Sequence, residues 1–176
     1  MNTVMLDFET LGNGKYAAIA QIGACYFDRI TGEIGKTFRT NVDAGSSTDC
    51  GGEIDAPTVY WWMEQSDEAR KSLLEEPRVS LQNALSELNN FLESGTTIWS
   101  HATFDFVILT ESLKRLKIDP KFSYRAARDI RTLMDLAKLD SKKFDRDGVH
   151  HDALADCLHQ VKYCVEAFRI IEKRRG

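Results

Sequence analysis

Residues 3–8 (TVMLDF) form an apolar run that contains one acidic residue, and this run opens a β-rich third of the chain. Two more runs rich in β-branched and aromatic residues follow, at 18–28 (AIAQIGACYFD) and 33–42 (EIGKTFRTNV). The short link between them has a glycine at position 32, which is typical of a hairpin connection. The pattern predicts three meandering antiparallel strands.

After residue 43 the pattern changes from strands to helices. Residues 43–57 (DAGSSTDCGGEIDAP) predict one long loop, and Pro57 is placed for the first turn of the next helix. Apolar residues at helical spacing predict another helix, which Ser80 caps and which stops at Gly95. The later expected elements are a strand at 96–100, a helix at 104–118, a strand near 123–129, a helix at 131–139 and a long amphipathic helix from about Asp152 to Lys173.

The order of these elements predicts an α/β fold with a mixed sheet of five to six strands flanked by helices. Three strands are expected to be antiparallel, and the later strands to be added beside the first. A chain of 176 residues suits one domain, 1–176, because neither side of the 43–57 loop has enough chain for a second core.

The composition is that of an ordinary soluble globular protein, with 43% hydrophobic and 28% charged residues. No run of about 18 apolar residues occurs, so we expect no membrane span. The N-terminus lacks a basic region and a cleavage-type site. We therefore expect no secretory signal and a cytoplasmic protein whose four cysteines are free thiols.

The net charge of −4 argues against a general nucleic-acid coat, but the charge is distributed unevenly. Residues 1–110 carry a net charge of −9, whereas residues 111–176 carry +5. This asymmetry is compatible with a basic face that meets a polyanion, and equally with a solvated helical surface.

Acidic residues occur in three apolar contexts. Asp7 and Glu9 stand two residues apart in the first strand, so their side chains point to the same face. Burying a carboxylate is unfavourable unless it is paired or bound to metal, and an outward-facing strand is the alternative. Asp105 opens a helix directly after a strand, where α/β sheets build sites, although carboxylates are also common at helix N-termini. Asp156 follows in the last helix, and such all-oxygen sets suit Mg²⁺ or Mn²⁺.

Three stretches, LDFETLG (6–12), HATFDFVIL (101–109) and HHDALADCLHQVKYC (150–164), resemble the motifs of the DEDDh 3'-5' exonucleases of the DnaQ-like or RNase T superfamily. TLGNGKYAAIAQIGACYFD, TVYWWMEQSDEAR and RDIRTL are similar to the branch of RNase AS-like exoribonucleases and phage or prophage exodeoxyribonucleases. The resemblance covers nearly the whole chain and implies an RNase H-like fold. One departure is His101 followed by Ala102, where many relatives have asparagine.

The resemblance implies that two Mg²⁺ ions, for which Mn²⁺ can substitute, are held by four carboxylates: Asp7, Glu9, Asp105 and Asp156. The implied reaction is hydrolysis of phosphodiester bonds from the 3' end of single-stranded or 3'-overhang DNA or RNA, with release of nucleoside 5'-monophosphates.

His151 precedes Asp156 by five residues and matches the general base of the family, which leaves His150 and Asp152 as bystanders. Asp152 is expected to cap the final helix. His159 is interpreted as a partly buried helix residue rather than a ligand.

Substrate contacts are expected from the aromatic residues near these motifs. Trp61 and Trp62 are adjacent, so in a helix one is expected to be core and the other exposed for base stacking; the alternative is that both pack against the sheet. Leu11 resembles the family position that wedges against the terminal base, and Thr10 and Phe104 complete the expected set. Three arginines are expected either to contact the phosphates of the substrate or to lie on a solvated or salt-bridged helix face. They are Arg125, Arg128 and Arg131.

Two other functions compete with this interpretation. His151 and Asp152 form the doublet of HD-domain phosphohydrolases, but that fold is all-helical and needs further spaced His and Asp ligands upstream, whereas this chain begins with a β-rich third and has few histidines. A catalytically weak, exonuclease-like nucleic-acid-binding module is the second alternative, and the presence of all four carboxylates argues against it. The sequence does not distinguish DNA from RNA. By resemblance to the RNase T and RNase AS branches, we expect a homodimer.

Overall fold

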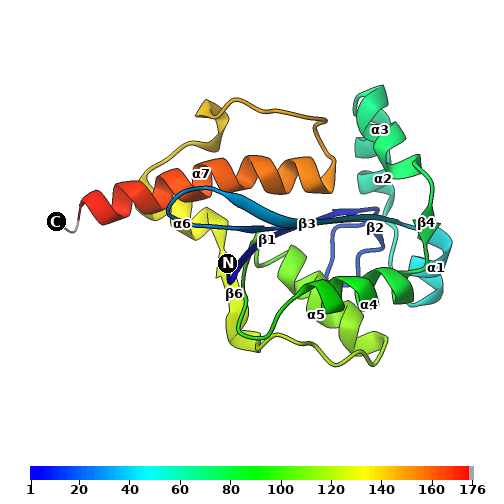
Figure 1. The fold of residues 1–176 in the computed structure, drawn as a ribbon. Helices are drawn as coiled ribbons and strands as arrows, with labels where there is room; N and C mark the ends of the chain where they lie inside the picture. The colour runs from blue at the N-terminus through cyan, green and yellow to red at the C-terminus, as the bar shows by residue number, and fades with distance from the viewer. Residues whose placement is uncertain (175–176) are drawn as a thin grey trace.

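The computed structural model of the chain describes residues 1–174 and contains a mixed sheet of six strands between two layers of helices (Figure 1). The strands are β1 (Thr3–Thr10), β2 (Ile19–Phe27), β3 (Ile34–Val42), β4 (Arg78–Val79), β5 (Thr97–Ser100) and β6 (Ala127–Asp129). Their order in the sheet is β4-β3-β2-β1-β5-β6. The first three strands pair antiparallel, and β5, β6 and β4 join in parallel, so the predicted α/β architecture is confirmed.

Within residues 1–174, seven α-helices connect and cover the strands. They are α1 (Ala44–Asp49), α2 (Ala56–Glu64), α3 (Asp67–Leu74), α4 (Leu81–Phe91), α5 (Asp105–Arg115), α6 (Ile130–Ala137) and α7 (Ala153–Lys173). Two expected caps are confirmed. The Ser80 side chain accepts the N–H of Asn83 at 3.3 Å, and the Asp152 side chain accepts that of Ala155 at 3.1 Å. No helix in the described part of the chain is long and apolar enough to cross a bilayer.

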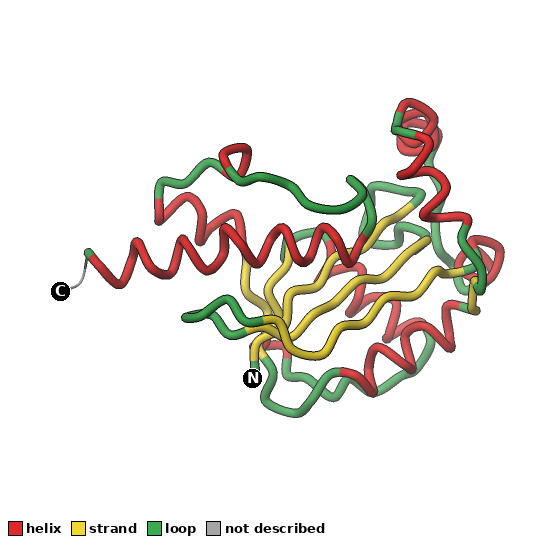
Figure 2. Tube along the Cα trace, turned by 45° about the horizontal axis from the view of Figure 1, so that its top comes forward, coloured by secondary structure: helices red, strands yellow, loops and turns green. Residues whose placement is uncertain are grey.

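The helices α6 and α7 lie on one face of the sheet, and α4 and α5 lie on the other (Figures 1 and 2). Strand β1 is buried along its whole length because both of its faces are covered. Its side chains alternate: Val4, Leu6 and Phe8 join the core with α4 and α5, and Met5 joins the core with α6 and α7. Asp7 has the same parity as Met5 and therefore belongs to the face that α7 covers.

The structure differs from the sequence-based expectations in four places, of which the first is helix α3, which was not predicted. The 43–57 segment is not a continuous loop, because the Asp43 side chain accepts the N–H of Ser46 at 2.7 Å and starts helix α1. The two-residue strand β4, which pairs only with the end of β3, was not predicted. Helix α4 ends at Phe91, before Gly95. The backbone N–H of Glu93, two residues later, donates to the Tyr26 hydroxyl at 2.8 Å.

The N-terminus of α7 packs directly against the backbone of β2. Gly23 lies opposite Asp7 in the β1–β2 pairing, and a Cβ atom at Gly23 would lie 2.2 Å from the carbonyl carbon of Ala153. The Gln21 side chain accepts the N–H of Ala153 at 2.6 Å and donates to Asn41 at 2.7 Å. These contacts fix the first turn of α7 over the carboxyl-terminal half of β1.

Candidate active site

Four carboxylates converge where β1, α5 and α7 meet. Asp7 and Glu9 come from β1, Asp105 is the first residue of α5, and Asp156 lies in the first turn of α7. All four are buried, with exposed fractions between 1% and 9%. The structure therefore brings the predicted acidic residues together although they are about 100 and 150 positions apart in the chain.

The carboxylates form two groups, each completed by a histidine. In each group, single ligand atoms of all three residues lie within 4.8 Å of one another. The groups are Asp7, His101 and Asp105, and Glu9, His151 and Asp156. Such spacing allows a cation to contact several of these atoms at once.

Burial and mutual repulsion raise the pKa of these acids. The pKa of Asp7 lies well above its usual value because of burial first, and then because of the charges of Asp105, Glu9 and Asp156. Burial raises the pKa of Asp105 to about 7, although the backbone N–H groups of Phe8 (3.2 Å) and His101 (2.9 Å) donate to its carboxylate. Divalent cations would relieve this repulsion, so the site fits them chemically.

The pKa values of Glu9 and Asp156 are raised for similar reasons. Burial, followed by the charges of Asp156 and Asp105, raises the pKa of Glu9 well above its usual value. Burial raises the pKa of Asp156 to about 6, even though Arg146 pairs with it at 2.7 Å. One arginine does not compensate four buried carboxylates.

Gln160 was missed in the sequence analysis and supports Asp7. Its Nε2 donates to Asp7 Oδ1 at 2.7 Å, and its Oε1 is buried without a hydrogen-bond partner among the described residues. Gln160 lies four residues after Asp156, on the same face of α7, and this helical spacing could have identified it. An unpaired buried oxygen beside a carboxylate is a further feature that a cation or an ordered water would satisfy.

His151 lies beside the carboxylates in a strained backbone conformation, with a φ of 62°. Its ring centroid is 4.7 Å from that of Trp61 and 3.9 Å from that of His150. Burial, followed by the charges of His150 and Arg146, lowers the pKa of His151 to about 4. The imidazole is therefore neutral at pH 7 and can accept a proton.

A first cleft, the acidic cleft, has a volume of about 610 Å³. Its lining includes Asp7, Glu9, Arg146, His151 and Asp156. His159 also contributes to this lining from a half-buried position on α7.

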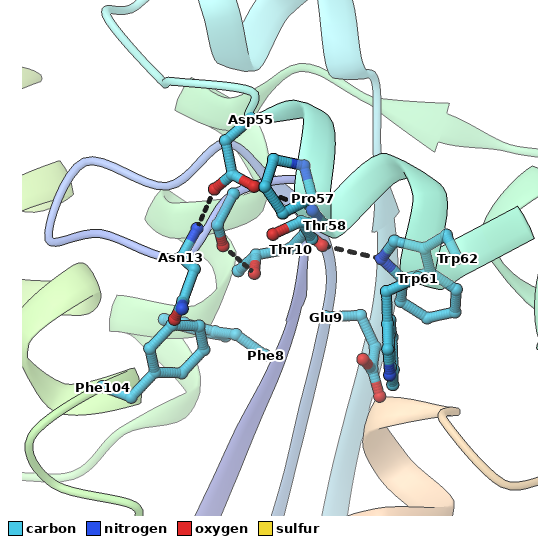
Figure 3. A pocket seen from close by; sticks show the side chains of 11 residues that line it. Phe8, Glu9, Thr10, Asn13, Asp55, Pro57, Thr58, Trp61, Trp62 and Phe104 are labelled. Carbon is cyan, nitrogen blue, oxygen red and sulfur yellow. Dashed lines mark hydrogen bonds between the residues drawn. The ribbon is translucent and has the colours of Figure 1, made fainter. Parts of the chain in front are cut away.

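A second cleft, the aromatic cleft, has a volume of about 640 Å³ and shares Glu9 with the acidic cleft. Figure 3 shows Phe8 and Phe104 on one side of it and the two tryptophans of α2 on the other. Trp62 is 6% exposed and donates from Nε1 to the carbonyl oxygen of Thr10 at 2.8 Å, whereas Trp61 is 40% exposed. The expectation of one core and one exposed tryptophan is confirmed.

Some expected substrate contacts lie elsewhere. Leu11 is half-buried and does not line the aromatic cleft, so its contact with a base stays a prediction. Arg125 and Arg128 are exposed, and Arg128 donates to the carbonyl oxygens of Arg125 and Ala127. Arg131 lies nearer, because it lines one small cleft together with His101 and another together with Phe104.

His101, the departure from the family pattern, forms part of the site. Its backbone N–H donates to Asp105, and its Nδ1 lies 3.9 Å from Asp105 Oδ2. Burial, followed by the charge of Arg131, lowers the pKa of His101 to about 4. A neutral histidine therefore borders the first carboxylate group.

The comparison with known domain families identifies the chain. The 3'-5' exoribonuclease Rv2179c-like domain matches residues 2–168. The chain belongs to this family. The chain is thus a 3'-5' exonuclease that acts on nucleic acid, as the resemblance of its motifs predicted.

Individual relatives agree with this assignment. The exodeoxyribonuclease of Enterobacteria phage T4 is 26% identical over 202 residues, which cover 94% of this chain and 88% of the phage protein. E. coli exonuclease I in complex with a dT13 oligonucleotide superposes with a TM-score of 0.67 at 14% identity, over 97% of this chain and 42% of the other. The nuclease domain of 3'hExo, a DEDDh family member bound to rAMP, superposes with a TM-score of 0.61 at 14% identity. This superposition covers 95% of this chain and 91% of the other. These likenesses confirm the RNase H-like fold, and the chain spans about two fifths of exonuclease I.

Proposed function

We propose that the protein is a divalent-metal-dependent exonuclease that removes nucleoside 5'-monophosphates from the 3' end of single-stranded or 3'-overhang nucleic acid. The observation that carries the proposal is the convergence of four buried, mutually repelling carboxylates next to the aromatic cleft, with Glu9 common to both. This arrangement suits a phosphodiester at the carboxylates and a terminal nucleotide in the aromatic cleft.

The residues that would hold the cations are Asp7, Glu9, Asp105 and Asp156. Two Mg²⁺ ions, or Mn²⁺ in their place, supply when bound the positive charge that neutralises the phosphate and stabilises the leaving 3'-oxygen. The carboxylate oxygens fit this role because they are the ligands that these hard cations prefer.

His151 is proposed as the general base. One of its ring nitrogens lies within 4.8 Å of carboxylate oxygens of Glu9 and Asp156, at the edge of the acidic cleft. The neutral imidazole accepts a proton from the water that attacks phosphorus, a new P–O bond forms, and the bond to the 3'-oxygen of the preceding nucleotide breaks. The ring of Trp61 lies edge-on to the imidazole, with ring centroids 4.7 Å apart.

The aromatic cleft is proposed to bind the terminal nucleotide. The exposed ring of Trp61 offers a stacking surface, and Phe104 faces it across the cleft (Figure 3). Trp62 and Thr10 fix the floor of this cleft through their hydrogen bond. Stacking of a base on an aromatic ring contributes about 1–3 kcal/mol and depends little on sequence.

The test is a 5'-labelled single-stranded oligonucleotide, offered as DNA and as RNA of the same sequence, with Mg²⁺ and with EDTA. Stepwise shortening from the 3' end in Mg²⁺ alone supports the proposal, and the ratio of the two rates gives the sugar preference. Binding of both oligonucleotides without cleavage would instead favour the alternative of a weak nucleic-acid-binding module. The homodimer stays a prediction, and a monomer mass from solution scattering would contradict it.

A further inference from the structure

Arg146 belongs to the irregular segment before α7, and its side chain lines the acidic cleft. Among residues 1–174 it is the one lysine or arginine that forms an ion pair with any of the four carboxylates: its Nη2 lies 2.7 Å from Asp156 Oδ1. Its side chain is 24% exposed and lines the acidic cleft together with Asp7 and Glu9. The guanidinium therefore lies where cations and a phosphate are proposed to bind.

The backbone on both sides of Arg146 is attached to α7. Lys162 donates from Nζ to the carbonyl oxygen of Asp145 at 3.1 Å and pairs with the carboxylate of Asp147 at 2.5 Å. Phe144 packs against Tyr163, with ring centroids 5.9 Å apart. The segment runs back along α7 (Figure 2), and the Arg146 side chain lines the acidic cleft.

We propose that Arg146 is a substrate-phosphate contact that exchanges partners during the working cycle. It pairs with Asp156 while the carboxylates lack cations. When cations take the oxygens of Asp156, the guanidinium turns to a non-bridging phosphate oxygen of the bound nucleic acid. This inference rests on the proposed function and names a residue for which the sequence motifs give no indication.

The chemistry of the cleft favours this exchange over a fixed structural pair. A guanidinium presents a planar set of N–H donors that matches phosphate oxygens in pairs, and it stays charged at any pH of interest. Cations at Asp156 would compete with Arg146 for the same carboxylate and leave the arginine unpaired. The phosphate of the substrate is the negative group that then enters the same cleft.

The first measurement is Mn²⁺ binding without nucleic acid, by isothermal titration calorimetry. Arg146→Met is expected to tighten Mn²⁺ binding about fivefold, because a competing cation is removed. Lys143→Met, which removes an exposed charge from the same segment, is expected to leave the affinity unchanged. Unchanged or weaker Mn²⁺ binding by Arg146→Met would show a purely structural ion pair and overturn the inference.

The second measurement is the affinity for a single-stranded oligonucleotide in Ca²⁺, by fluorescence anisotropy at several salt concentrations. Arg146→Met is expected to weaken binding about tenfold and to make the slope of log K against log salt shallower by about 0.7, the value for one phosphate contact on a single strand. Arg146→Lys should restore most of the slope, which a loss of loop packing would not allow. An unchanged slope in Arg146→Met would overturn the inference.

The two proposals fail in distinguishable ways. If the wild-type protein binds Mn²⁺ and shortens oligonucleotides while Arg146→Met binds both ligands as the wild type does, only the role of Arg146 is wrong. If the wild-type protein neither binds Mn²⁺ nor cleaves, the proposed function is wrong and this inference falls with it.

Discussion

Replacing Asp7 by asparagine is expected to abolish cleavage and yet to raise the thermal stability of the protein in EDTA. Asp7 is buried among like charges, so its ionised form destabilises the fold. The substitution keeps the shape of the side chain. An amide oxygen can still accept the hydrogen bond that Gln160 Nε2 donates to Asp7 Oδ1 at 2.7 Å.

The size of the gain follows from the spacing of the carboxylates. Oxygens of Asp7 and Asp105 lie within 4.8 Å of each other. At that separation two unit charges repel by about 3 kcal/mol for an effective dielectric constant of about 20. In a protein of this size 1 kcal/mol changes the melting temperature by about 2–4 °C, so Asp7→Asn is expected to gain roughly 6–12 °C at a pH where both carboxylates of the wild-type protein are ionised.

The gain should depend on pH with a definite sign. The pKa of Asp7 is raised in the folded state, so the wild-type protein loses stability as the pH rises from the ordinary carboxyl range through the raised value. The advantage of Asp7→Asn is therefore expected to be small near pH 4 and to grow as the pH rises toward 8, in melting curves followed by near-ultraviolet circular dichroism. No gain at pH 8, or a gain independent of pH, would refute the reasoning.

Asp129 provides a control of opposite sign. Burial opposes its ionisation, but hydrogen bonds from the side chain and the N–H of Thr132 and from the N–H of Ala102 lower its pKa overall. A lowered pKa contributes stability above the ordinary carboxyl range, and that stability is lost as the pH falls. Asp129→Asn should therefore lose stability at pH 8 and less at acid pH.

Three further outcomes are expected. His151→Ala should lower kcat by about 10²–10⁴ with little change in Mn²⁺ affinity by calorimetry, whereas His150→Ala keeps most activity; equal losses would show that the pair acts structurally. Gel assays should show cleavage with Mg²⁺ or Mn²⁺ but none with Ca²⁺, and rapid turnover in Ca²⁺ or EDTA would contradict the proposed cation site. Trp61→Ala should raise KM for a single-stranded oligonucleotide about tenfold, whereas Tyr60→Ala on the same helix, 64% exposed and outside the aromatic cleft, should not; a matching rise for Tyr60 would contradict base stacking on Trp61.

The order of the elements and the acidic residues could be predicted because their patterns are local. Asp7 and Glu9 stand two residues apart in one strand, so their side chains point to the same face of the sheet whatever surrounds them. Asp105 at the start of a helix, and His151 five residues before Asp156, belong to short motifs that can be recognised in the sequence alone.

The arrangement that unites these residues is not local. It needs the parallel pairing of β5 with β1 and the packing of α7 over β1 and β2, which depend on the whole sheet. Arg146 was missed because its segment shows no helical or strand periodicity in the sequence. Contacts of Lys162 on α7 with the neighbouring Asp145 and Asp147 hold this segment at the site. Strand β4 was missed because two residues form no pattern, and only the neighbouring end of β3 defines it.

The backbone of Gly23 touches the start of α7 and leaves no room for a side chain. A single methyl group there would push the start of α7 off the sheet, and His151 and Asp156 would move with it while Asp7 stayed behind. We therefore expect a chain with a side chain at this position to lose its nuclease activity while it retains every acid and histidine of the motifs. When activity is inferred across related genomes from those motifs alone, chains altered at this position would be counted as working enzymes.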